Sequence, residues 1–324
     1  MRAARCTSYG GIDAVTVEDV PVPEVGPGEV RVAVRAAAIN FPDLLLLENR
    51  YQVSIPVPFI PGSELAGVVE EAATDVVGLA PGDRVFGAAF VGAFAEQIAL
   101  PAASLTRMPA GSDFAAAAAF GVAHTTAYHS LRSVAEVEPG EWVAVLGAAG
   151  GVGLATVELA HHMGAKVLAA AAGKDRLEVC EDRGADAIVD YRAEDLKERM
   201  KELTEGGADV VIDPVGGPYA EQALRAMRRR GRFVTVGFAS GEIPRIPLNL
   251  VLLKGVTIKG FEMRTFMESE PELLLRDRAE LLDLFDRGLV HPHVSAVYPL
   301  EDVREALRAV AERRTTGKVV IEIA

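Results

Sequence analysis

The segment from residue 142 to residue 163 constrains the fold of this chain more than any other. An apolar run, WVAVL at 142–146, leads into GAAGGVG at 147–153, and an apolar helical pattern follows from Leu154 to Met163. This order predicts a buried strand, a glycine turn and a helix, the opening of a βαβ unit. Such a turn brings backbone N–H groups close to a pyrophosphate, and the helix N-terminus adds a partial positive charge. It therefore predicts a dinucleotide site formed by Ala149, Gly150, Gly151, Val152 and Gly153.

Six candidate strands alternate with helical segments after residue 123. They are Trp142 to Leu146, Lys166 to Ala171, Ala187 to Val189, Asp209 to Ile212, Arg232 to Val236, and Val256 to Lys259. Strands and helices that alternate in this way are typical of α/β proteins, and six strands indicate a doubly wound parallel sheet. Gly164, Gly184 and Gly231 follow apolar helical faces, so we expect them to end helices in the left-handed conformation.

The remainder of the chain has a different pattern. Residues 1 to about 122 read as short strands separated by Pro and Gly, with Val30, Val32 and Val34 in period-2 alternation. From about residue 261 a helix-rich stretch precedes the strand-like VSAVYPL. An amphipathic helix follows, with Val303, Ala306, Leu307 and Val310 on one face, and KVVIEIA is a closing strand. The first part should form a compact β-rich domain.

Composition excludes several classes of protein. The formal net charge of −13 would repel phosphate backbones and anionic lipid headgroups, so neither nucleic acid nor a membrane surface is an expected partner. Cys6 and Cys180 are the only cysteines, too few for a disulfide framework or a cysteine-rich zinc module. The amino terminus lacks the apolar core of a signal peptide, and no stretch reaches 18 uninterrupted apolar residues. We expect a soluble protein of the reducing cytoplasm.

The residues after the second candidate strand bear on the choice of dinucleotide. In the usual fingerprint an acidic residue at the end of this strand binds the ribose 2′-hydroxyl of NAD. Here the strand ends in alanines, and Lys174 and Arg176 follow. Two cations suit a 2′-phosphate, which favours NADPH over NADH. The alternative is that both are solvated residues of a first helical turn, and Asp175 between them weakens the phosphate interpretation.

Four motifs carry a resemblance to a known family. AAGGVG after a strand, PGSELAGVV at 61–69, PGDRV at 81–85 and GKVVIEI at 317–323 resemble the medium-chain dehydrogenase/reductase superfamily, in its zinc-independent quinone oxidoreductase, or zeta-crystallin-like, branch. The resemblance implies a GroES-like catalytic domain built from residues 1–122 and 263–324 around a Rossmann domain at 123–262. It also implies a homodimer through the edge strand at 256–259, where pairing would cover an unpaired apolar edge.

The same resemblance implies that the protein needs no metal. The zinc-dependent branch uses a Cys, a Gly-His-Glu motif and a second Cys as ligands. This chain has Asn40 and Ser63 at the first two positions and no Cys near residue 122. His291 and His293 have a spacing that could hold a metal, but no Cys completes a site, which favours a surface or core role.

Further site residues also follow from the resemblance. Asn40 and Tyr51 would face the nicotinamide and the substrate as catalytic hydrogen-bonding groups. Leu45 and Leu47 replace the Tyr and Arg often found there, which implies a more apolar pocket. The remaining implied cofactor contacts are Tyr191 near the adenosine phosphate, or else packed at a strand end, Gly237, Phe238, Phe261 and Met263 near the nicotinamide, and Lys318 beside the cofactor.

These observations lead to one main hypothesis about function. We expect a zinc-independent oxidoreductase that transfers a hydride from NADPH to an apolar electrophile, a quinone or an activated enone. Two alternatives stay open. One is an enoyl-CoA reductase, which Leu45 and Leu47 would suit. The other is a non-catalytic NADPH-binding protein of the crystallin kind.

Overall fold

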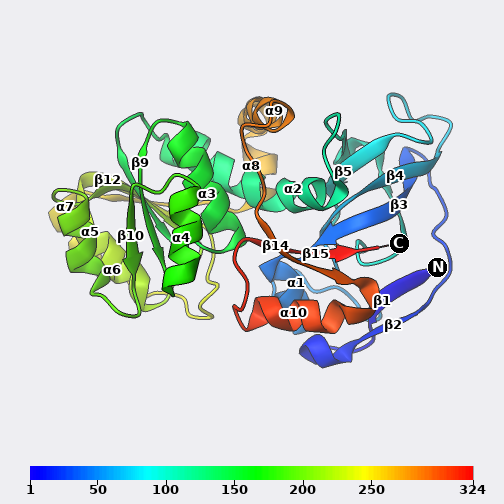
Figure 1. The fold of residues 1–324 in the computed structure, drawn as a ribbon, viewed down its shortest axis with the longest axis horizontal. Coiled ribbons are helices and arrows are strands. Elements are labelled where there is room, and N and C mark those ends of the chain that lie inside the picture. The colour runs from blue at the N-terminus through cyan, green and yellow to red at the C-terminus, as the bar shows by residue number, and fades with distance from the viewer. Residues whose placement is uncertain (324) are drawn as a thin grey trace. The chain divides into compact units, whose positions relative to one another are not determined.

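The computed structural model describes residues 1–323, which divide into two compact units (Figure 1). Unit 1 comprises Met1–Val122 together with the chain from His291 onward, and unit 2 comprises Ala123–Val290. Unit 1 is rich in strands, and unit 2 alternates strands with helices. The mixed α/β architecture expected from the sequence is confirmed.

Unit 2 contains a six-stranded sheet, in the order β10-β9-β8-β11-β12-β13. All its neighbouring strands are parallel. The strands are β8 (Trp142–Leu146), β9 (Lys166–Ala171), β10 (Ala187–Asp190), β11 (Ala208–Asp213), β12 (Met227–Thr235) and β13 (Thr257–Gly260). The six predicted strands and the doubly wound order are thus confirmed. The strand order reverses between β8 and β11, where dinucleotides bind in such sheets.

Helices cover both faces of this sheet (Figure 1). The connecting helices are α3 (Gly151–His162), α4 (Lys174–Asp182), α5 (Leu196–Leu203), α6 (Pro218–Ala226) and α7 (Leu248–Lys254). Ala144 and Leu146 pack into the core that holds residues of α5, α6 and α7. Val143 and Val145, which point the other way along β8, are equally buried. Burial of both faces explains why the strand is an unbroken apolar run in the sequence.

Two of the three predicted glycine caps are confirmed, and one is wrong. Gly164 and Gly184 have φ angles of 79° and 97°, in the left-handed region. Gly231 instead lies inside β12, beside a register shift between β11 and β12. A Cβ at Gly231 would lie 2.8 Å from the carbonyl oxygen of Asp209, so the position requires a small residue. The positive φ of 63° belongs to its neighbour Arg230.

Unit 1 joins the two ends of the chain in one sheet. Its strands run β14-β15-β3-β4-β5-β7, with β6 also paired to β3, and β1 and β2 form a separate pair. Their bounds are β1 (Arg2–Cys6), β2 (Val15–Asp19), β3 (Glu29–Ala38), β4 (Glu64–Ala72), β5 (Arg84–Ala88), β6 (Gln97–Pro101), β7 (Leu105–Arg107), β14 (Val294–Pro299) and β15 (Lys318–Glu322). Because β15 pairs antiparallel with β3, the closing strand completes a sheet begun by the first forty residues.

The helices of unit 1 support this sheet. They are α1 (Phe41–Leu47), the part of α2 (Phe114–His129) up to Val122, and α10 (Val303–Ala311), with 3-10 turns at Gly11–Ala14, Ala102–Ser104 and Leu300–Asp302. Val303, Ala306 and Leu307 are buried in the core, and Val310 packs against it, as the amphipathic pattern predicts.

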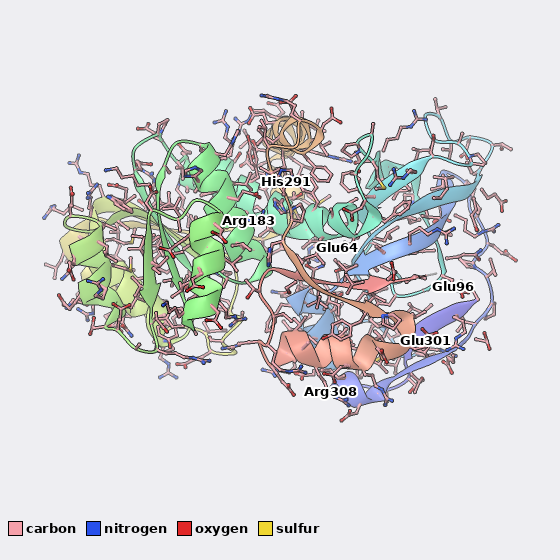
Figure 2. All side chains as sticks on the ribbon, viewed as in Figure 1. Glu64, Glu96, Arg183, His291, Glu301 and Arg308 are labelled. Atoms are coloured by element: carbon pink, nitrogen blue, oxygen red, sulfur yellow. The ribbon has the colours of Figure 1, made fainter. Side chains whose placement is uncertain are left out.

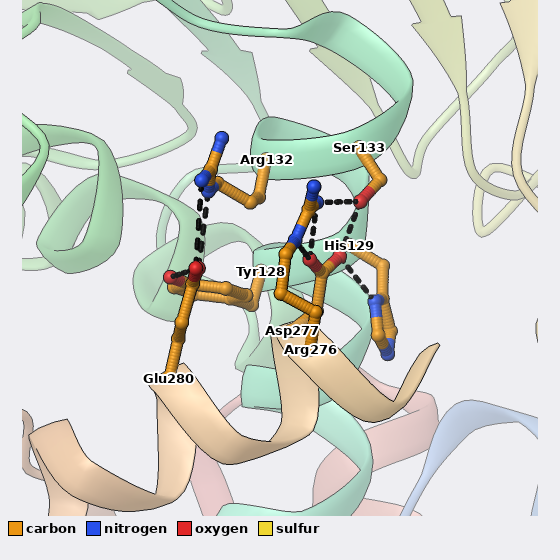
Figure 3. Close-up of polar contacts among 7 residues, drawn as sticks. All are labelled: Tyr128, His129, Arg132, Ser133, Arg276, Asp277 and Glu280. Carbon is orange, nitrogen blue, oxygen red and sulfur yellow. Dashed lines mark hydrogen bonds and ion pairs between the residues drawn. The ribbon is translucent and has the colours of Figure 1, made fainter. Parts of the chain in front are cut away.

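The second domain boundary differs from the predicted one. Residues 263–290, with α8 (Met263–Ser269) and α9 (Pro271–Asp286), belong to unit 2 instead of the catalytic domain. Ion pairs and hydrogen bonds, of which the His129–Asp277 pair is buried, connect α9 to the end of α2 and to the π-helical turn Ser130–Ala135 (Figure 3). Asp277 Oδ2 lies 2.8 Å from His129 Nδ1 and accepts from Ser133, and Glu280 accepts from Tyr128 at 2.7 Å. These contacts join segments that lie far apart in the sequence.

No helix within the described residues combines the length and the apolar character that crossing a membrane requires.

Candidate functional site

The glycine turn after β8 is built so that backbone alone can approach a ligand. Gly147 has a φ of 59°, and Gly150 precedes the first residue of α3. A Cβ at Gly153 would overlap the carbonyl oxygen of Gly147 and come within 2.8 Å of the Ala148 Cα. The first N–H groups of α3, beginning at Gly151, have no partner inside the helix. Ala149 is buried in the turn, and Val152 is the second residue of α3. The turn therefore fits a pyrophosphate.

Most of the other predicted cofactor residues follow the carboxyl ends of strands in the same sheet. Lys174 follows β9, Tyr191 follows β10, Gly237 and Phe238 follow β12, and Phe261 and Met263 follow β13. Because these strands are all parallel, their carboxyl ends share one edge of the sheet with the glycine turn. The topology of unit 2 thus brings these residues to one edge.

The cationic residues lie at the start of α4. The Lys174 side chain is 85% exposed, and its Nζ is 3.9 Å from Glu178 Oε1, so it is accessible to an anion. Arg176 is half-buried two residues further along the helix. The sequence analysis overlooked Asp190, at the end of β10, whose Oδ2 accepts the N–H of Gly173 at 3.3 Å. That bond fixes the loop from which Lys174 projects.

Two aromatic rings stack near the end of β10. The Tyr191 and Tyr219 ring centroids are 4.2 Å apart, with 30° between the ring planes. Tyr219 comes from the start of α6 and was not predicted. Tyr191 is therefore held by ring stacking, in agreement with the packing interpretation, and its predicted contact with a phosphate stays a prediction.

The loop after β11 is a part of this edge that the sequence analysis missed. The Oδ1 atom of Asp213 accepts the N–H groups of Val215 and Gly216, both at 2.8 Å. Gly216 and Gly217 have φ angles of 67° and 61°. Burial raises the pKa of Asp213. The sequence DPVGG at 213–217, which follows a strand and contains two glycines, was the available signal.

Hydrogen bonds and ring stacking hold the segments that are predicted to border the nicotinamide. The N–H of Ser240, in the loop that contains Gly237 and Phe238, donates to the carbonyl of Val215 at 2.9 Å. The Phe261 N–H donates to Thr235 at 3.0 Å, and the Phe261 ring stacks on His129 at 6.0 Å. The Phe261 N–H is thus already used within the protein.

Unit 1 contains a buried polar cluster centred on Lys318. Its Nζ donates to Glu64 Oε1 at 2.6 Å, to Asn40 Oδ1 at 2.6 Å and to the carbonyl of Ile39 at 3.0 Å. The side chains of Lys318 and Glu64, the latter labelled in Figure 2, are 5% and 1% exposed. All three N–H donors of this ammonium are taken by the protein. The structure thus makes Lys318 an internal cation, and its predicted contact with the cofactor stays a prediction.

Asn40 belongs to the same cluster. Its Nδ2 donates to Glu64 Oε1 at 2.9 Å and to Ser63 Oγ at 3.2 Å, while its Oδ1 accepts from Lys318. Both N–H groups and the oxygen of the amide are therefore occupied. Asn40 holds the cluster together, and its predicted hydrogen bond to a substrate carbonyl stays a prediction.

Asp43 is the fifth member, and it was not predicted. Its Oδ2 accepts the backbone N–H of Asn40 at 2.7 Å, at the start of α1. Burial raises the pKa of Asp43 to about 7, against the opposing effects of that N–H and of the Lys318 charge. The signal in the sequence was the spacing of Asn40 and Asp43, a helix cap followed three residues later by an acceptor.

The donor set of this cluster does not fit zinc. Asn40 and Ser63 offer an amide and a hydroxyl, where zinc prefers thiolate and imidazole, and the Glu64 carboxylate already holds the Lys318 ammonium. Within residues 1–323, no three His, Cys, Asp or Glu side chains are placed to hold a metal ion.

Tyr51 and the leucines of α1 occupy different environments. Tyr51 is half-buried and packs against the core of unit 1, with its ring 6.4 Å from that of Phe90. Leu47 is fully buried in that core, so the prediction that it makes a pocket more apolar is wrong. Leu45 is partly exposed.

Comparison with known proteins decides the family. A model described as an alcohol dehydrogenase GroES-like domain matches residues 26–110, and one described as a zinc-binding dehydrogenase matches 151–277. The quinone oxidoreductase-like protein 2 homolog of Nematostella vectensis is 39% identical over 99% of this chain and 88% of its own length. The chain belongs to the medium-chain dehydrogenase/reductase superfamily, among its quinone oxidoreductase-like proteins. That membership places it among oxidoreductases.

Solved structures of this superfamily share the whole fold. The Escherichia coli quinone oxidoreductase complexed with NADPH matches with a TM-score of 0.92 at 28% identity, covering 99% of this chain and 100% of the other. The quinone oxidoreductase of Thermus thermophilus, described with its NADPH complex, matches with a TM-score of 0.88 at 34% identity and the same coverage.

Proposed function

We propose that this oxidoreductase transfers a hydride from NADPH to a quinone or an activated enone. The observation that carries the proposal is the glycine turn between β8 and α3, at the point where the strand order of the sheet reverses. Support also comes from two relatives of the same fold, both quinone oxidoreductases described in complex with NADPH.

Each part of the chain has a task in this reaction. NADPH supplies the hydride, and the glycine turn binds its pyrophosphate. Lys174 and Arg176 bind the 2′-phosphate, and the segments at 237–238 and 261–263 border the nicotinamide. The Tyr51 hydroxyl donates a hydrogen bond to the substrate oxygen and stabilises the charge that develops there.

Deuterium transfer tests the reaction. NADPH oxidation should require an electrophilic acceptor, and with NADPH deuterated at the transferring C4 position the label should appear on the carbon of a reduced enone. A substrate panel of quinones, enones and enoyl-CoA thioesters then ranks the alternatives. Preference for the thioesters would establish an enoyl-CoA reductase. NADPH binding without turnover of any acceptor would instead indicate a non-catalytic binding protein.

The cofactor preference can be measured by titration. If Lys174 and Arg176 bind the 2′-phosphate, NADPH should bind at least about tenfold more tightly than NADH, a difference of about 1.4 kcal/mol. Lys174→Ala should weaken NADPH binding and leave NADH binding unchanged. Arg229, an exposed cation on β12, offers a matched control, and Arg229→Ala should change neither affinity. Equal affinity of the unmodified protein for both cofactors would contradict the assignment.

Replacing Tyr51 with Phe removes only a hydroxyl. We expect kcat to fall by about 10²-fold with enones, whose enolates carry a concentrated charge, and by less with quinones, whose reduced anions are weakly basic. Steady-state kinetics with both acceptor classes measures the difference. Equal losses for both classes would contradict a hydrogen bond from Tyr51 to the developing charge.

We further propose a homodimer formed through β13. This strand is the edge of the sheet, and Ile258 on it is 41% exposed. Nearby on α7, Leu248, Leu252 and Leu253 are 77%, 82% and 65% exposed, an apolar surface that a second copy would cover. Light scattering at micromolar concentration should give the dimer mass. The double variant Leu252→Asp/Leu253→Asp should be monomeric, and Leu275→Asp on α9 should stay dimeric. A monomeric unmodified protein would refute the proposal.

A further inference from the structure

The loop after β11 contacts two of the segments that hold the cofactor in the proposed reaction. This loop, which we call the β11 loop, consists of Asp213 at the end of β11 and residues 214–217 before α6. A Cβ at Gly147 in the glycine turn would lie 2.6 Å from Val215 Cγ2, so the β11 loop packs directly against that turn. The β11 loop is also hydrogen-bonded to residues 236–242, which follow β12. It therefore links the pyrophosphate segment to a segment predicted to border the nicotinamide.

The position of Phe238 depends on the β11 loop. Backbone hydrogen bonds of 2.8 to 3.4 Å join the two loops, from Val236 and Gly237 to Asp213, from Ala239 to Pro214, from Ser240 to Val215 and from Gly217 to Glu242. The Phe238 ring lies against Gly216, where a Cβ would be 2.8 Å from the ring atom Cδ1. Phe238 is nevertheless 38% exposed, which leaves part of its side chain available to a ligand.

Asp213 fixes the conformation of the β11 loop. Its Oδ1 accepts the N–H groups of Val215 and Gly216, both at 2.8 Å, and the chain turns tightly over this oxygen. The side chain is 0% exposed, and its Oδ2 is buried with no hydrogen-bond partner among residues 1–323. Burying a carboxyl group with one unpaired oxygen costs folding free energy. The arrangement therefore favours a role in the geometry of the loop over a role in stability.

We propose that Asp213 is a positioning residue for hydride transfer. By holding Val215 and Gly216, it keeps the Phe238 ring in place, and that ring limits where the nicotinamide can lie. The inference rests on the proposed function and deepens it, because it names the group that fixes the position of the reacting ring of NADPH. Asp213 acts through Phe238 and takes no part in the bonds that form and break.

The glycine turn is held without Asp213. The Gly150 N–H donates to the Gly147 carbonyl at 2.9 Å, and the Ala148 N–H donates to the Ala170 carbonyl on β9 at 3.1 Å. The phosphates of the cofactor should therefore bind whether or not Asp213 is present. The probe 2′,5′-ADP carries a phosphate on each of these two ribose positions and has no nicotinamide. Comparing it with NADPH separates the two ends of the cofactor site.

Asp213→Ala removes the acceptor of both N–H groups. In calorimetric titrations NADPH should bind at least about tenfold more weakly, while the affinity for 2′,5′-ADP should stay within about twofold of that of the unmodified protein. With a quinone, kcat should fall by about 10²-fold, because a displaced nicotinamide is badly oriented for hydride transfer. Asp213→Asn keeps an oxygen that accepts both N–H groups, so it should restore the NADPH affinity and kcat to within about threefold.

Gly216→Ala displaces Phe238 and leaves Asp213 in place. The added methyl group would lie 2.8 Å from the ring and 2.9 Å from the Glu242 carbonyl oxygen, so we expect the same losses as in Asp213→Ala. Gly255→Ala is the matched control, because its φ of 62° is close to the 67° of Gly216, but its Cβ would meet no other atom of the described residues within 4 Å. It should leave both affinities and kcat unchanged.

Three results would overturn the positioning role. The first is unchanged NADPH affinity and kcat in either Asp213→Ala or Gly216→Ala. The second is an equal loss of affinity for NADPH and 2′,5′-ADP, which would extend the effect to the glycine turn. The third is an Asp213→Asn variant as impaired as Asp213→Ala, which would assign the effect to the charge. No turnover by the unmodified protein would refute the proposed function, while the two affinities would still test Asp213.

Discussion

Replacing Lys318 with Met is expected to destabilise the protein by about 3–5 kcal/mol, because the change removes one partner of a buried ion pair. The Glu64 carboxylate, 1% exposed, would lose a donor at 2.6 Å, and the Asn40 oxygen would lose another. Urea unfolding followed separately by probes in the two units should place the loss in unit 1. The free energy of unfolding of unit 2 should change little.

Two controls distinguish the buried pair from a general loss of charge. Arg314 pairs with Glu305 at the surface, where the side chains are 46% and 49% exposed, so Arg314→Met should destabilise the protein far less than Lys318→Met does. Adding Glu64→Gln to Lys318→Met removes both charges and should recover part of the loss. If Lys318→Met costs no more than Arg314→Met, the cluster does not stabilise unit 1 in the way described.

Gly153→Ala should weaken NADPH binding by at least about 100-fold, which corresponds to about 2.7 kcal/mol. A methyl group there cannot fit beside the Gly147 carbonyl and the Ala148 Cα, so the turn must open and its N–H groups must move away from the pyrophosphate. Fluorescence titration of NADPH measures the loss, and circular dichroism checks that the fold persists.

Gly150 provides a graded comparison in the same turn. A Cβ at Gly150 would lie 3.3 Å from the Gly147 oxygen, with a φ of −82° that any residue adopts, so Gly150→Ala should have a much smaller effect. Gly10→Ala, in unit 1, should leave NADPH binding unchanged. Comparable losses for Gly150→Ala and Gly153→Ala would mean that crowding against Gly147 is not the cause.

The fold could be predicted where the signal was local. The apolar run 142–146 and the glycines after it lie within one short segment, so the strand, turn and helix followed from their order. The second domain boundary, after residue 290, could not be predicted from a local pattern. Residues 263–290 belong to unit 2 because Asp277 and Glu280 contact side chains on α2, about 150 residues earlier in the chain, and no local pattern records such a contact.

The same difference between local signals and distant contacts applies to the candidate site. Residues that follow strands of one parallel sheet were predictable, since topology alone brings them to one edge. The hydrogen bond between Asn40 and Lys318 was not predictable in this way, because the two residues are 278 positions apart in the sequence. Leu47 seemed available to a pocket, and the turn of α1 directs it into the core instead. Burial depends on the packing of distant segments, which a sequence motif does not contain.

The pairing of β15 with β3 has a consequence for the order in which the protein folds on the ribosome. Unit 2 is continuous in sequence, so it can fold once residue 290 has emerged, while the sheet of unit 1 still lacks its closing strand. Until Lys318 is synthesised, the Glu64 carboxylate has no internal counter-charge. The nascent chain thus carries a finished nucleotide-binding fold before its acid cluster can close, and a chain that lacks β15 would leave unit 1 open to proteases while unit 2 is already folded.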